Sequence, residues 1–173
     1  MTRPQPPAGM SRRHPAWLIA IGFGTGLVPK IPGTLASLAA LPFAWVIHRF
    51  FGAIGLTLAG AAALVAGLWA CGKLVPPQGF DDPSHIVIDE VAGQWLTLAA
   101  LAVVAPSPDA LFYVMGFALF RLFDIVKPWP VDWAERRLKG GLGVMADDVL
   151  AAIYAGLGAA FIYVYARGLI SFS

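Results

Sequence analysis

Charged residues are scarce in this chain. Only 13% of its 173 residues are Asp, Glu, Lys or Arg, whereas 58% are hydrophobic, and the mean hydropathy is +0.73. A soluble domain carries roughly a quarter charged residues, so the composition argues against a soluble globular enzyme and against a disordered chain. With a net charge of +2, the chain also lacks the basic groove that tracks nucleic-acid phosphates, and we expect no nucleic-acid partner.

Cysteine is almost absent. Cys71 is the single cysteine and lies in an apolar stretch. An intramolecular disulfide and a cysteine-rich metal site are therefore excluded.

Several long segments of the chain contain no charged residue at all. A helix needs about 20 apolar residues to cross a bilayer, and four runs meet or nearly meet that length, with a fifth interrupted only by Arg121 and Asp124. The runs are 31–47, 50–72, 91–108, 149–166 and 110–126. They predict an all-α polytopic membrane bundle of four to five spanning helices plus a short N-terminal interfacial helix. Buried helices of a soluble all-α domain are the alternative, but the chain has little polar surface to coat such a bundle.

Proline, glycine and charge divide the chain further. We expect a flexible basic tail at 1–15 and a single helical membrane domain at 16–173. Within that domain the pattern predicts helices near 16–23, 35–50, 53–72, 86–105, 110–127 and 147–167. The predicted loops are 24–34, 73–85, 106–109 and 128–146.

Basic residues are distributed unequally between the two sides of this predicted topology. Alternating crossings place ten Lys and Arg residues on one side, eight in the tail and the loops 24–34, 73–85 and 128–146, and Arg121 and Lys127 towards the end of helix 110–127. Only Arg49 and Arg167 lie on the other side. Cytoplasmic loops carry the Lys/Arg excess, so we expect the first side to face the cytoplasm. The expected location is the bacterial inner membrane, with a multi-pass topology.

Acidic residues gather at the same end of the predicted helices. Asp89 and Glu90 open one helix, Asp124 lies near the end of the next, and Asp147 and Asp148 open the last. Ionisable groups at the edge of apolar spans are costly and usually functional. The plainer interpretation is that the acids stabilise helix N-termini, or that Asp124 simply pairs with Arg121 or Lys127.

Clustered carboxylates repel one another unless a cation neutralises them, and Mg²⁺ prefers oxygen ligands and shares phosphate oxygens. Arg121 and Lys127, spaced along one helix face with Asp124, are suited to bind phosphate. The glycine-rich segments 24–26, 32–34 and 140–143 supply turns before helix N-termini near 35 and 147, which favour anions. The residues thus indicate metal-assisted chemistry on a phosphate at the cytoplasmic boundary.

Four sequence blocks, in order, resemble the phosphatidylglycerophosphatase A family. They are GFGTG and PKIPGT (22–26 and 29–34, followed by Ser37-Leu38), IVIDE (86–90) with Gly93, RLFDIVKPWP (121–130), and GGLGVMADD (140–148). Ala36 replaces a glycine that is common in the family, a small change in size. The resemblance implies a Mg²⁺-dependent lipid phosphatase that converts phosphatidylglycerophosphate, an anionic phospholipid, into phosphatidylglycerol and phosphate.

These observations give a site hypothesis. The predicted metal ligands are Asp89, Glu90, Asp124, Asp147 and Asp148, with Asp89, Asp124 and Asp148 as catalytic residues. The predicted substrate-binding residues are Thr25, Lys30, Thr34, Arg121 and Lys127. Direct attack by water is favoured over a phospho-aspartate intermediate, because no dedicated nucleophile motif is present. An ion-coupled transporter and a structural scaffold are the competing functions, and the oligomeric state stays open.

Overall fold

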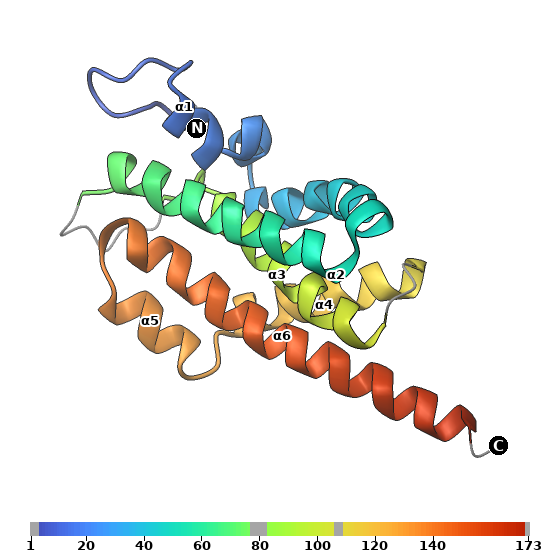
Figure 1. The fold of residues 1–173 in the computed structure, drawn as a ribbon. Helices are drawn as coiled ribbons and strands as arrows, with labels where there is room; N and C mark the ends of the chain where they lie inside the picture. Colours follow the sequence, from blue (N-terminus) through green and yellow to red (C-terminus); the bar gives the residue numbers. More distant parts are fainter. Residues whose placement is uncertain (1–3, 77–82, 106–108, 172–173) are drawn as a thin grey trace.

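A computed structural model of the chain describes residues 4–76, 83–105 and 109–171, with side chains as far as residue 166. The described residues form helices and connecting turns only, which confirms the all-α prediction (Figure 1). The elements are α1 (Pro15–Ala20), the 3-10 helix η1 (Gly22–Leu27), α2 (Pro32–Leu74), α3 (Ile88–Val104), α4 (Ala110–Val126), α5 (Val131–Arg137) and α6 (Gly140–Ser171). Parts of the predicted tail and loops (1–3, 77–82 and 106–108) lie outside the described residues.

The long helix α2 consists of two arms that meet at Gly52. Its backbone angles there are φ 61° and ψ −154°, a conformation that is accessible to glycine and costly for other residues. Figure 1 shows the chain reversing direction at this point, so that the second arm returns along the molecule. The arms correspond to the two helices predicted at 35–50 and 53–72.

The predicted loop at 128–146 is wrong in two respects. It contains helix α5, and α6 begins at Gly140 rather than near 147. The early start of α6 has a tertiary cause: a methyl group at Gly141 would lie 2.6 Å from the Gly72 backbone nitrogen. Glycine lowers helix propensity, but here it allows α6 to approach the end of α2 closely. Likewise, the loop predicted at 24–34 contains η1 and the first turn of α2.

Helix α3 lies at the centre of the bundle and contacts α2, α4 and α6. Small residues permit these contacts. A methyl group added at Gly60 would lie 2.8 Å from Leu96, one at Gly67 would lie 3.3 Å from Ile88, and one at Gly156 would lie 2.7 Å from Ala100. Close approach through small residues is typical of helices that pack in lipid.

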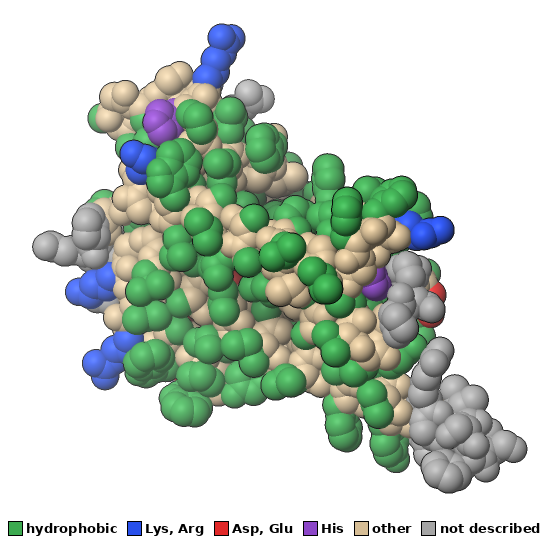
Figure 2. All heavy atoms as spheres, in the orientation of Figure 1, with side chains coloured by type: hydrophobic (Ala, Val, Ile, Leu, Met, Phe, Trp, Pro, Cys, Tyr) green, Lys and Arg blue, Asp and Glu red, His purple; other side chains and the backbone are tan. Residues whose placement is uncertain are grey.

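The face of the molecule that Figure 2 shows is strongly apolar. Large hydrophobic side chains on α2 and α6 are exposed, among them Phe50, Ile54, Leu58, Leu157 and Phe161. Two helices, α2 and α6, are long and apolar enough to cross a membrane, which is fewer than the four to five predicted. The difference arises because α2 contains two of the predicted segments, while α3 and α4 have 17 residues each, at the lower limit of a bilayer crossing.

Candidate active site

Three helices bring the predicted acidic residues together. Asp89 and Glu90 lie in the first turn of α3, Asp124 lies near the end of α4, and Asp147 and Asp148 lie on α6. Asp89, Glu90 and Asp148 each place a carboxylate oxygen within 4.8 Å of the others. Asp148 is only 4% exposed and lies within electrostatic reach of Asp124 and Asp147 as well. We call these five residues the acidic cluster.

The expectation that Asp147 and Asp148 open a helix is wrong. Because α6 starts at Gly140, both residues lie about two turns inside it, beyond the first turn where the helix dipole stabilises a carboxylate. Their burial therefore needs another source of compensation, which the neighbouring basic side chains supply in part.

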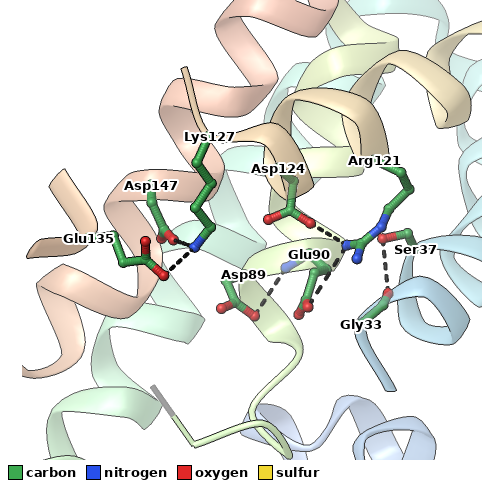
Figure 3. Close-up of polar contacts among 9 residues, drawn as sticks. All are labelled: Gly33, Ser37, Asp89, Glu90, Arg121, Asp124, Lys127, Glu135 and Asp147. Atoms are coloured by element: carbon green, nitrogen blue, oxygen red, sulfur yellow. Dashed lines mark hydrogen bonds and ion pairs between the residues drawn. The ribbon is translucent and has the colours of Figure 1, made fainter. Parts of the chain in front are cut away.

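Arg121 connects α4 to the cluster. Its Nη1 lies 2.5 Å from Asp124 Oδ2, one turn away on the same helix, and 3.9 Å from Glu90 Oε1 on α3. Figure 3 shows the guanidinium group between these two carboxylates. The Arg121 Nε is buried and has no hydrogen-bond partner among the described residues, so the side chain retains a donor for a further anion.

Lys127 ends α4 and reaches two other helices. Its backbone is left-handed, with φ 47° and ψ 58°. Its Nζ donates to Asp147 Oδ2 of α6 at 2.8 Å and to Glu135 Oε1 of α5 at 2.6 Å (Figure 3). Burial alone would lower the pKa of the Lys127 ammonium group, but the hydrogen bonds to Asp147 and Glu135 outweigh burial, and the pKa is raised. Lys127 is therefore cationic at neutral pH.

The first turn of α2 closes the cluster from another side. A Cβ at Gly33 would overlap the Glu90 carboxylate, so the missing side chain makes room for Glu90. The Ser37 hydroxyl donates to the Gly33 carbonyl oxygen at 3.0 Å, as Figure 3 shows. Gly33 and Ser37 belong to the first sequence block of the family resemblance, but neither is among the predicted site residues.

Glu135 is absent from the predicted site residues, because the pattern predicts a loop where α5 lies. Asp132 and Arg136 are spaced four residues apart and form an ion pair. This spacing of opposite charges is typical of a helix and could have predicted α5. Two further polar residues, both on α3, are absent from the predicted site. Gln94 and Thr97 follow Glu90 at helical spacing, are fully buried, and have side-chain polar atoms without hydrogen-bond partners among the described residues.

The structure does not bring three predicted substrate-binding residues into the cluster. The Thr25 hydroxyl donates to the Gly22 carbonyl oxygen at 3.0 Å. Lys30 is exposed, with φ 81°, and Thr34 is half-buried in the first turn of α2. Within the described residues neither Lys30 nor Thr34 forms an ion pair or side-chain hydrogen bond with the acidic cluster.

The charge balance of the site favours binding of a cation. Arg121 and Lys127 pair with Glu90, Asp124, Asp147 and Glu135, whereas Asp148 is buried among other carboxylates. Buried charge without compensation is strongly unfavourable. Glu90 Oε2 and Asp148 Oδ2 are buried and have no hydrogen-bond partner among the described residues, so both are suited to act as metal ligands.

Comparisons with known proteins agree with this arrangement. The family model of phosphatidylglycerophosphatase A matches residues 18–163. The chain is 39% identical over 140 residues to phosphatidylglycerophosphatase A of Escherichia coli K12, covering 81% of this chain and 78% of the relative. It is 38% identical over 155 residues to phosphatidylglycerophosphatase A of Haemophilus influenzae, covering 90% and 93%.

A third relative carries a different name. The chain is 43% identical over 145 residues to a protein of Bacteroides thetaiotaomicron named putative phosphatidylinositol-3-phosphatase, covering 80% of this chain and 87% of the relative. No solved structure matches the chain. The match over most of the chain, together with the buried acidic cluster, shows that the chain belongs to the phosphatidylglycerophosphatase A family.

Proposed function

We propose that this chain is a lipid phosphatase that hydrolyses phosphatidylglycerophosphate to phosphatidylglycerol and phosphate. The observation that carries the proposal is the buried acidic cluster, which lies beside two basic side chains in a chain of this family. A site with carboxylates for a cation and cations for a phosphate is suited to a phosphomonoester. Asp89, Glu90 and Asp124 lie at the ends of α3 and α4, a position that suits a headgroup at the membrane surface.

Asp89, Glu90 and Asp148 are the proposed Mg²⁺ ligands. Their oxygens already lie within 4.8 Å of one another, and hard oxygen donors are the ligands that Mg²⁺ prefers. When bound, Mg²⁺ would offset the charge of the phosphoryl group and activate or orient water. Asp124 and Asp147, which were predicted as ligands as well, are engaged with Arg121 and Lys127, so their first role in this proposal is to hold those side chains.

Arg121 and Lys127 are the proposed phosphate-binding residues. Each is held by carboxylates on a neighbouring helix or turn, which fixes the position of its charge before substrate binds. Thr34 follows Gly33, the residue whose backbone lies against Glu90, and Lys30 lies three residues before it. In this proposal both lie at the entrance for the headgroup. The hydroxyl of Thr25 is used within η1, so this residue shapes the turn. The attacking group in this proposal is water, oriented by the cluster.

The proposed topology has five crossing segments: the two arms of α2, then α3, α4 and α6. Their apolar outer side chains support it, and so does the excess of Lys and Arg in the tail and in the connections that lie at the end of the acidic cluster. By the positive-inside rule this end faces the cytoplasm. The proposed location is accordingly the bacterial inner membrane.

The test is phosphate release by the purified chain in detergent, with phosphatidylglycerophosphate, with and without Mg²⁺. Phosphatidylinositol 3-phosphate is the second substrate, because of the name of the Bacteroides relative. We expect Mg²⁺-dependent release that is faster with phosphatidylglycerophosphate. Faster release from phosphatidylinositol 3-phosphate would instead make the inositol lipid the preferred substrate. Absence of release from both lipids, combined with ion flux in reconstituted vesicles, would favour the transporter instead.

A further inference from the structure

An apolar cavity of about 480 Å³ lies beside the acidic cluster, between η1, the two arms of α2 and α3. Its volume is within the range of small-molecule sites, roughly 300–1,000 Å³. Alanines form much of the wall, including Ala36, Ala39, Ala40 and Ala63, and the larger lining side chains include Phe43 and Trp95. The small side chains leave the space open, whereas the larger ones bound it.

The polar side-chain groups at this cavity are already satisfied. Trp95 Nε1 donates to the Ala40 carbonyl oxygen at 3.0 Å, and the Thr25 hydroxyl donates to the Gly22 carbonyl oxygen at 3.0 Å. Water in a cavity needs two to four polar partners, and these side chains offer only the hydroxyl oxygen of Thr25 as an acceptor. The ligand that suits the cavity is therefore apolar along its length.

The cavity continues from the acidic cluster along one face of α2. Gly33 touches Glu90, and Ala36 and Ala40, at helical spacing from Gly33, line the cavity. On α3, the cavity residues Ile88 and Val91 flank the cluster residues Asp89 and Glu90 in sequence. An anionic headgroup in the cluster and an apolar tail in the cavity would thus belong to one amphiphile.

The rim of the cavity opens to the apolar outer surface. Phe23 is 83% exposed and Phe43 is 64% exposed, and both line the cavity. An acyl chain can enter sideways from the bilayer at such a rim without crossing a polar layer.

We infer that this cavity binds one acyl chain of the phospholipid substrate and thereby positions the phosphate at the acidic cluster. The inference rests on the proposed function for the identity of the headgroup. Lipid tails and the cavity wall are similarly apolar, so the transfer gains little hydrophobic free energy. The cavity would instead act by orienting the substrate, because a displacement of a bound substrate by about 1 Å can greatly slow the reaction.

The test compares Ala39→Phe with Ala61→Phe in proteoliposomes. Both alanines are exposed residues of α2, but only Ala39 lines the cavity. The probe is a diacyl phosphomonoester lipid with a diazirine on one acyl chain, and labelled peptides are mapped by mass spectrometry after illumination. We expect wild type and Ala61→Phe to be labelled around Phe43 and Trp95, and Ala39→Phe to lose this labelling.

A kinetic arm uses the same variants. We expect kcat/KM for long-chain phosphatidylglycerophosphate to fall about tenfold in Ala39→Phe, with a shift of preference towards shorter acyl chains, and to change little in Ala61→Phe. Equal labelling of all three proteins along the lipid-facing surface would overturn the inference, and so would labels that join two copies of the chain. Labelling needs no turnover, so a chain that labels in the cavity but releases no phosphate would contradict only the proposed function.

Discussion

The Glu90 carboxylate occupies the space that a side chain at Gly33 would fill. This contact joins the first turn of α2 to the first turn of α3, and it holds Glu90 beside Arg121, whose Nη1 lies 3.9 Å from Glu90 Oε1. The backbone of α2 therefore helps to define the position of a proposed metal ligand.

Gly33→Ala should displace Glu90 and lower phosphatase activity. The added methyl group would overlap the carboxylate, and a displacement of about 1 Å at a catalytic group can cost on the order of 100-fold in rate. Gly72→Ala is the matched control, because a methyl group there meets nothing within 4 Å and brings the same helix-propensity gain of about 1 kcal/mol. Phosphate release and thermal unfolding are measured for both. Equal activity of the two variants would contradict the role of Gly33.

Asp148→Asn should raise the Mg²⁺ concentration needed for half-maximal activity. The substitution replaces one of three clustered oxygen donors with a weaker ligand and removes one negative charge. Asp132→Asn is the control, since Asp132 pairs with Arg136 within α5 and has no part in the cluster. The measurement is phosphate release against Mg²⁺ concentration after chelation. An unchanged Mg²⁺ requirement in Asp148→Asn would remove this residue from the ligand set.

Lys127→Ala should destabilise the bundle as well as lower activity. It would leave the buried carboxylate of Asp147 without its partner at 2.8 Å, and breaking a buried ion pair costs about 3–5 kcal/mol. The exposure of Lys127, whose side chain is 22% accessible, places the expected loss of unfolding free energy at the lower end. The measurement is a double-mutant cycle with Asp147→Ala, in which chemical denaturation gives the free energy of unfolding of each protein. Additive losses would show that the two residues are not coupled.

Gln94→Leu should make the fold more stable and the enzyme less active. The Gln94 side chain is fully buried, and neither of its polar atoms has a hydrogen-bond partner among the described residues. Removing such a group relieves a penalty of about 1–3 kcal/mol, yet it also removes a polar group that lies one turn from Glu90. Melting temperature and turnover are the measurements. A variant with lower stability would indicate that Gln94 already has a bound partner such as water.

The positions of the helices were readable from the sequence because hydropathy is a local property. Both arms of α2, together with α3 and α4, follow the predicted segments closely. Local patterns did not predict the start of α6, because a run of glycines is typical of a turn. The helical role of these glycines depends on the close approach of Gly141 to Gly72. The local signal for α5 is limited to the spacing of Asp132 and Arg136, and this short helix is fixed in part by contact with α6.

The sequence by itself determined the family, the all-α class and the convergence of five carboxylates at one end, since alternating helices must place those acids on the same side. Tertiary structure alone decided which partners they have: Arg121 with Asp124 and Glu90, and Lys127 with Asp147 and Glu135. It also left Thr25 and Lys30 outside the cluster. Ion pairs depend on distances of a few ångströms between separate helices, and those distances are set by how small residues allow the helices to pack.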